Sequence, residues 1–183
     1  MQIFQNYING KFSKPLSDKY FENFNPADNG DIIGKFPLSG KEDVENAVQV
    51  SKDTFKKWKM VPAPKRGDIL RKAGDIFNRR KNELAEIMTR EMGKPVFETE
   101  GDVQEAIDTA YYAASETRRL FGHTVPSEMN DKQNMSFRVP VGVCGIITAW
   151  NFPIAVPSWK ILPAIAAGNT VVFKPSKDSP HSG

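Results

Sequence analysis

The stretch Val141-Gly-Val-Cys-Gly-Ile-Ile-Thr-Ala-Trp-Asn-Phe-Pro153 sets the interpretation of the whole sequence. Its run of valine and isoleucine stops at a polar amide, Asn151, and Pro153 follows closely. This pattern predicts a buried strand that ends in a tight turn, with the proline opening the next helix. In open α/β sheets, ligands bind beyond the carboxyl ends of the strands. We therefore expect Asn151 to lie in a ligand-binding crevice.

The residues after this turn predict a second strand, parallel to the first. The first strand is expected over 141–148, an apolar helix over 154–167, ended by Gly168, and the second strand over Thr170–Lys174. Strand, crossover helix and strand make a right-handed βαβ unit, which builds a parallel sheet. The fold class is therefore predicted as α/β.

Hairpins are predicted near the start of the sequence. The pair Asn9-Gly10 lies between apolar residues and indicates a tight hairpin, and a second hairpin is expected to turn through 25–30. Ser39 and Glu42 then have the spacing of a capping box, which predicts the start of a helix.

Two longer helical regions follow. Apolar periodicity predicts one region from Pro64 to Met92, closed by Gly93, and another over 97–120, closed by Gly122. These helices are expected to form an N-terminal addition to the βαβ unit.

The polar segments around the βαβ unit carry weaker signals. Residues 124–135 are typical of a loop, and 135–139 alternate like a strand. Asp178 or Ser179 could cap a further helix, with Pro180 in its first position. Two strands and a helix just begun would leave one side of the sheet uncovered, so we expect the chain to be the front part of a longer protein.

The overall composition argues against several classes of function. The 183 residues carry 25 basic and 22 acidic side chains, well interspersed, and a net charge of +3, which gives no support for nucleic-acid or membrane binding. No histidine and cysteine have the spacing of metal ligands, so no metal site is expected. A single cysteine allows no intrachain disulfide, and no signal peptide is recognisable, which together favour a cytoplasmic protein.

Asn151 and Lys174 are the residues whose positions suggest chemistry. The Asn151 amide could donate hydrogen bonds to an oxygen that becomes negative during acyl chemistry, and losing one such donor costs roughly 3 kcal/mol of transition-state stabilisation. Alternatively, it bonds its own backbone and shapes the turn. Lys174 could bind ribose hydroxyls or phosphate oxygens of a nucleotide, or it could simply end its strand in solvent.

Cys144 lies within the first strand of the unit and is expected to be buried, protonated and unreactive. His123 and His181 are isolated, with no neighbour that indicates a catalytic role. Neither a Gly-x-Gly-x-x-Gly nor a P-loop pattern is present.

Several motifs, in this order, resemble the NAD(P)-dependent aldehyde dehydrogenase superfamily. The resemblance covers nearly the whole chain and corresponds to the first part of a full-length member. The motifs are Tyr7-Ile-Asn-Gly10, Asn25-Pro-Ala27, Glu91-Met-Gly-Lys-Pro95, Tyr111-Tyr-Ala113, Pro140 to Pro153, Trp159-Lys160, Pro163-Ala164, Gly168-Asn-Thr170 and Val172-Phe-Lys-Pro175.

The resemblance implies an aldehyde-dehydrogenase-like fold, in which the chain is the N-terminal part of a Rossmann-like, parallel-sheet cofactor domain. Residues 1–123 would be its hairpins and helices. Residues 124–139 would begin an oligomerisation arm, and 140–183 would be the first βαβ unit of the cofactor-binding sheet. The complete protein would then be a homodimer or homotetramer.

The resemblance also implies a reaction, the oxidation of an aldehyde to a carboxylic acid. In this family a cysteine thiolate attacks the aldehyde to give a thiohemiacetal, hydride passes to the nicotinamide of NAD or NADP, and a glutamate activates the hydrolytic water. The motifs of that cysteine and that glutamate do not occur in this chain, and Cys144 does not match the nucleophile. The chain alone is therefore expected to be inactive.

Individual roles follow from the same resemblance. Asn151 would be the oxyanion-stabilising amide, and Phe152 and Trp159 would contribute to the aldehyde tunnel. The residues implied to contact the cofactor are Thr148, Ala149, Trp150, Asn151, Lys174, Pro175, Ser176 and Lys177. Many NAD-preferring members have a glutamate at the position of Lys177. A lysine there would attract the 2′-phosphate of NADP, so we expect NADP to be favoured or used alongside NAD.

Two other functions stay open from the sequence. The chain could be a naturally short, non-catalytic module that binds a nucleotide or a partner through its sheet. It could also belong to a related acyl-phosphate reductase, although the Trp150–Pro153 turn is typical of the aldehyde-oxidising branch.

Overall fold

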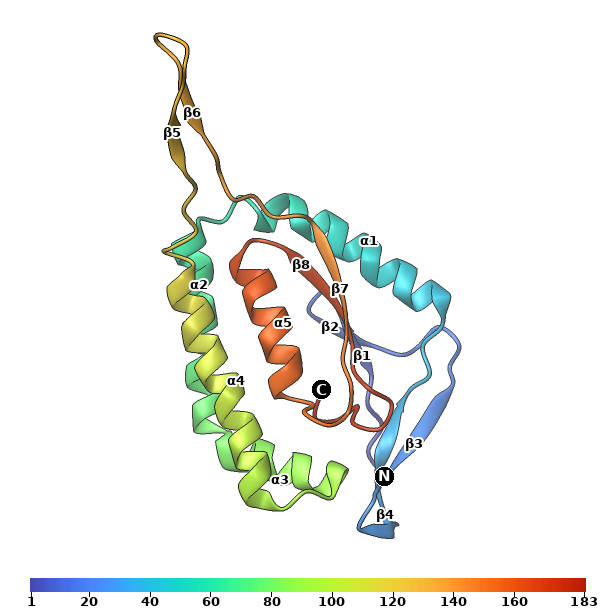
Figure 1. The fold of residues 1–183 in the computed structure, drawn as a ribbon. Helices are drawn as coiled ribbons and strands as arrows, with labels where there is room; N and C mark the ends of the chain where they lie inside the picture. Colours follow the sequence, from blue (N-terminus) through green and yellow to red (C-terminus); the bar gives the residue numbers. More distant parts are fainter.

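The computed structural model describes all 183 residues, which form four two-stranded sheets and five helices (Figure 1). None of the helices combines the length and apolar character needed to cross a membrane. In chain order the elements are β1 (Asn6–Ile8), β2 (Lys11–Ser13), β3 (Tyr20–Asn25), β4 (Asp28–Pro37), α1 (Lys41–Trp58), α2 (Ala63–Arg79), α3 (Lys81–Met92), α4 (Val96–Glu116), β5 (Thr124–Pro126), β6 (Gln133–Met135), β7 (Val143–Ile147), α5 (Ala155–Ala166) and β8 (Thr170–Lys174).

The βαβ unit confirms the predicted α/β class. β7 and β8 are parallel, and their register runs from Val143 beside Thr170 to Ile147 beside Lys174. α5 connects them and packs against both strands (Figure 1). The two strands therefore end side by side at the same edge of the sheet.

Asn169 ties the two ends of this unit together. Its side-chain oxygen accepts hydrogen bonds from the backbone amides of Val141 and Gly142, at 2.7 and 3.0 Å. Its side-chain nitrogen donates to the carbonyl of Ala164 near the end of α5, at 3.1 Å. This buried amide thus satisfies backbone groups where the chain enters β7 and leaves α5.

α1 covers the side of the strand pair that the sequence interpretation left open. Thr170 donates through its hydroxyl to the carbonyl of Ser51 at 3.0 Å, and the Trp58 indole donates to the carbonyl of Ile165 at 3.2 Å. In Figure 1 the strands lie between α5 and α1. The expectation of an uncovered side was wrong because the covering helix lies about 120 residues earlier in the chain, with Thr170 and Ser51 separated by 119.

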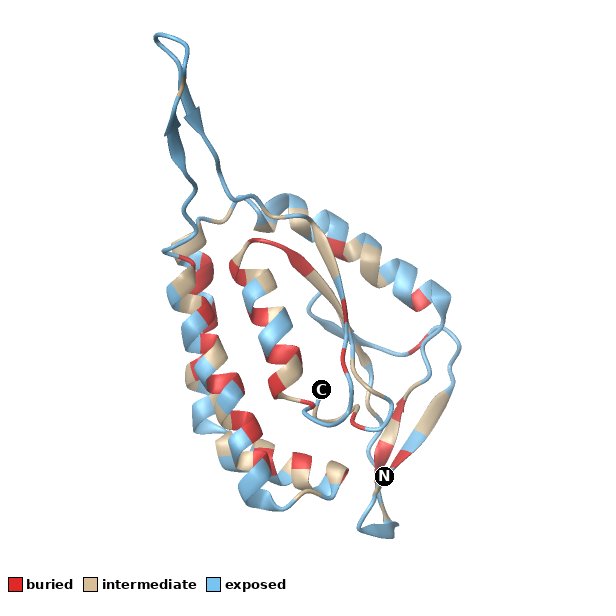
Figure 2. Cartoon of the chain, viewed as in Figure 1, coloured by how far each residue is buried: buried red, intermediate tan, exposed pale blue.

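The main apolar core lies where α2, α4 and α5 meet. Figure 2 shows buried residues along these three helices. The central side chains are Leu70, Ala110, Ala113, Leu162 and Ala166. Gly67 allows α2 to approach α4 closely, because a Cβ atom there would overlap the Thr117 hydroxyl and lie 2.6 Å from the carbonyl oxygen of Ala114.

The predicted Ser39–Glu42 capping box is wrong by one residue. α1 begins after Gly40, whose amide donates to the Asp43 carboxylate at 2.9 Å. Ser39 instead exchanges hydrogen bonds with the side chain of Asn6 in β1. A tertiary contact therefore uses the hydroxyl that local spacing had assigned to the cap.

The two long helical regions are confirmed, but their ends differ from the prediction. The region over 64–92 is divided at Arg80, whose ψ of 14° departs from the helical range, into α2 and α3. Gly93 ends α3 in the left-handed conformation, with φ 71°, as predicted. α4 ends at Glu116, earlier than expected, and Gly122 lies beyond it in the following segment.

The two N-terminal hairpins are confirmed. β1 and β2 are joined by Asn9 and Gly10, both with positive φ (55° and 72°), as the predicted turn requires. β3 and β4 pair around a tighter turn than expected, formed by Pro26 and Ala27.

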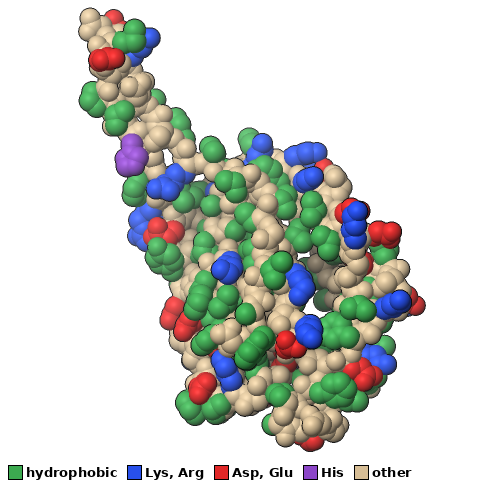
Figure 3. Space-filling view, turned by 45° about the vertical axis from the view of Figure 1, so that its right-hand side comes forward, with side chains coloured by type: hydrophobic (Ala, Val, Ile, Leu, Met, Phe, Trp, Pro, Cys, Tyr) green, Lys and Arg blue, Asp and Glu red, His purple; other side chains and the backbone are tan.

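Residues 124–135 form a hairpin rather than the predicted loop. β5 and β6 pair antiparallel, and β6 stops at Met135, so the strand predicted over 135–139 is also wrong. The hairpin projects from the body of the molecule (Figure 1), and hydrophobic side chains lie on its surface (Figure 3). Exposed apolar residues in this region are Val125, Met129, Met135, Phe137 and Val139.

The predicted helix start at Asp178 or Ser179 is absent, and residues 177–182 form turns. The buried carboxylate of Glu91 holds these turns in place. It accepts hydrogen bonds from the amides of His181 and Ser182 (2.8 and 2.7 Å), from the Ser182 hydroxyl (2.5 Å) and from the Asn23 side chain (2.7 Å). Burial raises the pKa of Glu91, whereas these hydrogen bonds act to lower it.

Candidate functional site

The candidate site lies beyond the carboxyl ends of β7 and β8. Ile147 and Lys174 are paired at this edge, so the segments that follow them, which begin at Thr148 and Pro175, leave the sheet side by side. Thr148 is buried, and the backbone then turns through residues 150–154 before α5 begins. The fold thus brings the two predicted polar segments to one edge.

Asn151 is exposed in this turn, and its side-chain amide makes no hydrogen bond within the chain. The structure therefore does not contain the alternative hydrogen bond, from the Asn151 side chain to its own backbone. Both amide N–H groups are free to donate to a ligand.

Lys94 holds the backbone of the same turn. Its ammonium group donates a hydrogen bond to the carbonyl oxygen of Asn151 at 2.6 Å. It also lies 4.0 Å from the centre of the Phe152 ring, within the range of a cation–π interaction. The sequence interpretation assigned no role to Lys94, although it lies in the quoted Glu-Met-Gly-Lys-Pro motif, because nothing local indicates a contact with a residue 57 positions away.

Asp102 holds the other end of the turn. This α4 residue is only 2% exposed, and one carboxylate oxygen accepts a hydrogen bond from the amide of Ala155, the first residue of α5, at 2.7 Å. The other oxygen is buried without a partner. Burial raises the pKa of Asp102, whereas the hydrogen bond from Ala155 and the positive charge of Lys94 act to lower it. Sequence reasoning did not select Asp102 either.

The segment after β8 presents two lysines. Lys174 is exposed, and its ammonium group donates to the carbonyl of Pro175 at 2.9 Å. Ser176 accepts a hydrogen bond from the amide of Asp178 at 3.2 Å, which fixes a turn. Lys177 is exposed and forms no ion pair. Lys174 and Lys177 can therefore both reach a ligand at this edge.

Aromatic side chains lie in the turn and on α5, the helix that follows it. Trp150, Phe152 and Trp159 are 54%, 38% and 46% exposed, and Ala149 beside them is exposed as well. Such partly exposed rings can offer flat apolar walls to a ligand.

Cys144 and the histidines do not take part in this site. Cys144 is only half-buried within β7, rather than buried as predicted, because the pairing of β7 with β8 alone leaves one edge of the strand open. His181 packs against the rings of Phe4 and Phe36 in the N-terminal region, with ring centres 4.7 and 6.3 Å away. His123 is exposed at the base of the β5–β6 hairpin.

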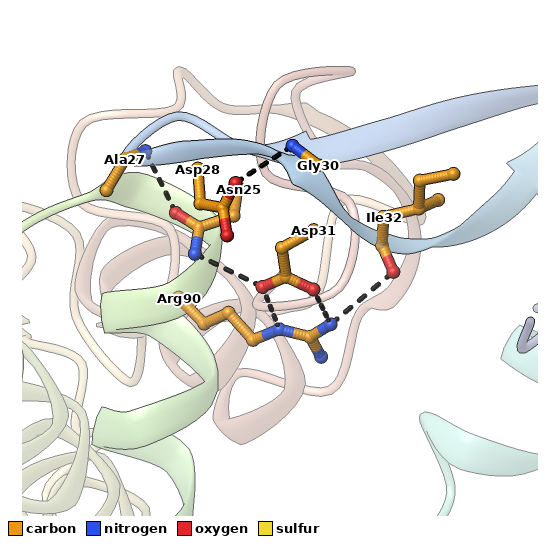
Figure 4. Close-up of polar contacts among 7 residues, drawn as sticks. All are labelled: Asn25, Ala27, Asp28, Gly30, Asp31, Ile32 and Arg90. Carbon is orange, nitrogen blue, oxygen red and sulfur yellow. Dashed lines mark hydrogen bonds and ion pairs between the residues drawn. The ribbon is translucent and has the colours of Figure 1, made fainter.

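A shallow groove of about 350 Å³ lies beside Lys94 but does not include Asn151. Arg90 forms one wall, where it pairs with Asp31 of β4, and Asn25 donates a hydrogen bond to the same carboxylate at 3.2 Å (Figure 4). The hydrogen bond from Arg90, followed by that from Asn25, lowers the pKa of Asp31 to about 2. Because Arg90 is already paired with Asp31, we interpret this groove as a structural junction between the β3–β4 hairpin and α3.

A parallel βαβ unit with polar side chains beyond the carboxyl ends of both strands is typical of α/β proteins, which bind ligands at that edge of the sheet. The aldehyde dehydrogenase family matches residues 12–183 of the sequence. The chain belongs to this family, as the resemblance of its motifs had indicated.

Comparisons with individual proteins agree with this assignment. The α-ketoglutaric semialdehyde dehydrogenase of Bacillus subtilis is 41% identical over 174 residues, which are 95% of this chain and 36% of that protein. Among solved structures, the succinate-semialdehyde dehydrogenase from Burkholderia pseudomallei is 35% identical with a TM-score of 0.95, over 98% of this chain and 37% of the other. An NADP-dependent enzyme of E. coli is 33% identical with a TM-score of 0.95, over 98% and 37%. The chain therefore spans little more than a third of the length of these proteins.

Proposed function

We propose that the chain works as part of a longer NAD(P)-dependent aldehyde dehydrogenase, in which it supplies the first βαβ unit of the cofactor-binding sheet. The observation that carries the proposal is the free Asn151 amide at the carboxyl edge of the β7–β8 pair. In this proposal the nucleophilic cysteine and the general-base glutamate lie outside the 183 residues.

Asn151 would act on the reacting aldehyde oxygen. When a nucleophile adds to the carbonyl carbon, that oxygen gains negative charge, and two pre-oriented N–H donors stabilise it more than they stabilise the neutral aldehyde. The amide is suited to this role because it has no competing partner within the chain. Phe152 and Trp159 would contribute apolar walls to the aldehyde tunnel.

The edge of the sheet has the donors that a nicotinamide dinucleotide would need. Lys174 can donate to ribose hydroxyls, Thr148 to Trp150 can border the cofactor from β7, and Pro175 to Lys177 can do so from β8. The nicotinamide ring, when bound, accepts the hydride that leaves the substrate carbon. Lys177 adds a free positive charge beside the ribose position, so we propose that NADP is used at least as readily as NAD.

The β5–β6 hairpin would begin the arm through which copies of the complete enzyme associate. Its projecting position and its exposed apolar side chains support this part of the proposal, because a monomer leaves them in water. A homodimer or homotetramer is the expected assembly.

Substitution of Asn151 tests the proposal. In the full-length enzyme, assayed with semialdehydes among the substrates, Asn151→Ala should lower kcat by about 10²-fold to 10³-fold. Asn46→Ala, which removes an exposed amide of α1, is the matched control and should leave kcat unchanged. The 183-residue chain alone should show no turnover.

Activity of Asn151→Ala within twofold of the wild type would contradict the assigned role. Turnover by the 183-residue chain would show that the nucleophile lies within it. A full-length protein that binds NADP but oxidises no aldehyde would instead favour the non-catalytic module.

A further inference from the structure

The turn that carries Asn151 is held at both ends by charged side chains from distant parts of the chain. Lys94 follows α3 and donates to the carbonyl oxygen of Asn151 at 2.6 Å. Asp102 lies on α4 and accepts from the amide of Ala155 at 2.7 Å. Only Phe152, Pro153 and Ile154 lie between the two anchored peptide groups.

The contact at Lys94 acts directly on the residue that bears the functional amide. A hydrogen bond to the Asn151 carbonyl fixes the plane of the peptide that follows its Cα atom. The same ammonium group lies over the Phe152 ring, which restricts the next side chain as well. Lys94 itself is half-buried and follows Gly93, the C-terminal cap of α3, so its starting position is defined by a helix end.

The contact at Asp102 fixes the beginning of α5. A negative charge at a helix N-terminus is favoured by the helix dipole, and here the carboxylate bonds one of the amides that the helix itself leaves free. The residue is almost fully buried, and its second oxygen has no hydrogen-bond partner. A buried carboxylate of this kind is costly unless a nearby positive charge offsets it. The positive charge of Lys94 acts against this cost, although burial has the larger effect on the pKa of Asp102.

We propose that Lys94 and Asp102 form a two-point clamp that positions the Asn151 amide. This inference rests on the proposed function, because it gives the turn a catalytic purpose. Both are positioning residues, since each acts on the backbone of the turn and not on the reacting atoms. Rigid support of this kind matters because a misplacement of about 1 Å can cost about 10²-fold in rate.

Lys94→Met in the full-length enzyme tests the first point of the clamp. The methionine keeps much of the apolar stem but cannot donate, so kcat and kcat/KM should fall together by about 10-fold to 100-fold. The KM for NADP should stay unchanged, because the Asn151 amide acts in the transition state. Lys94→Arg, which can still donate, should recover part of the loss. Lys72→Met, an exposed lysine of α2 without an ion pair, is the control.

Asp102→Leu tests the second point. Leucine is close to aspartate in size but cannot accept from the Ala155 amide, so kcat should fall several-fold. Asp102→Asn, whose amide oxygen can still accept, should recover part of the loss. A double variant that changes both Lys94 and Asp102 should lose less kcat than the product of the losses in the two single variants, because both residues hold the same turn. Fully multiplicative losses would show that the residues act separately and would overturn the clamp.

Amide hydrogen exchange of residues 149–156 gives a readout that does not depend on turnover. Lys94→Met should raise exchange there and leave the rest of α5 protected, with Lys72→Met unchanged. Raised exchange in an enzyme that oxidises no aldehyde would support the clamp and remove only the proposed function. Unchanged exchange and unchanged kcat in an active enzyme would overturn the clamp and leave the proposed function standing.

Discussion

In the proposed function, single side chains at the carboxyl edge of the β7–β8 pair decide which cofactor and substrate groups are bound. Asn151 contributes two free donors, and Lys177 contributes a positive charge on the segment that follows β8. These residues come from different segments of the chain, and the pairing of Ile147 with Lys174 is what brings the segments together. The properties of the edge therefore depend on strand register as much as on residue type.

Lys177→Glu should shift the cofactor preference towards NAD. A carboxylate repels a 2′-phosphate and accepts hydrogen bonds from ribose hydroxyls, so kcat/KM for NADP relative to NAD should fall by about 10-fold or more. Steady-state kinetics of the full-length enzyme with each cofactor measure this ratio. Lys72→Glu, at an exposed position of α2, controls for the change in net charge. A wild-type enzyme that strongly prefers NAD would show that Lys177 points away from the cofactor.

Asp31 should make the free energy of unfolding depend on pH. Its pKa in the folded protein is about 2, below its ordinary value of 3.8, because of its bonds to Arg90 and Asn25. A carboxyl with a depressed pKa adds stability that is present above the unfolded value and is lost as pH falls through the folded value. The free energy of unfolding should therefore decrease between about pH 4 and about pH 2.

Denaturant unfolding of Asp31→Asn over that pH range checks this expectation. The variant should show a shallower pH dependence than the wild type, whereas Asp131→Asn, in the exposed hairpin loop, should show the wild-type slope. Equal slopes for all three proteins would mean that the Asp31–Arg90 pair adds nothing to stability in water.

Helix packing sets the limits on substitution in the N-terminal part of the chain. α2 and α4 approach each other so closely at Gly67 that a methyl group has no room, whereas Gly101 on the exposed side of α4 has open space around it. Gly67→Ala should lower the free energy of unfolding by about 1–3 kcal/mol through overpacking. Gly101→Ala should raise it by up to about 1 kcal/mol through helix propensity. Urea denaturation measures the free energy of unfolding of both variants. An equal increase in both would disprove close packing at Gly67.

Elements with strong apolar periodicity were predictable from the sequence, and those held by tertiary contacts were not. β7, α5 and β8 follow from their apolar runs and turn residues. Arg80 interrupts a helical pattern that looks continuous, and the hydrogen bond of Ser39 to Asn6 displaces the expected cap. The β5–β6 hairpin escaped prediction because its residues are polar or exposed and its pairing rests on backbone hydrogen bonds.

The same distinction applies to the candidate site. Asn151 and Lys174 could be selected because each follows an apolar run at a strand end. Lys94 and Asp102 could not, because they reach the turn from the segment between α3 and α4 and from α4, which are 57 and 53 residues away from their partners in the chain. Their contacts exist only once the helices have packed around the βαβ unit.

For the molecule as a whole, the β5–β6 hairpin should be separable from the body. β5 and β6 make their main contacts with each other. When residues 125–134 of the full-length protein are replaced by a two-residue Asn-Gly turn, the protein should still fold and give the circular dichroism spectrum of a folded protein. Light scattering should then show a smaller assembly than for the wild type. An unchanged mass would place the association surface elsewhere, and Asn46→Ala serves as a control that keeps the hairpin.

Glu91 has a consequence for how this chain is made. Its carboxylate bonds Asn23, 68 residues before it, and Ser182, 91 residues after it. A ribosome delivers the chain from its first residue, so β3 and α3 emerge long before the Ser182 hydroxyl and the amides of residues 181 and 182. Until those three donors arrive, the carboxylate stays hydrated. The junction between β3 and α3 is therefore completed only after residues 181 and 182 have left the ribosome.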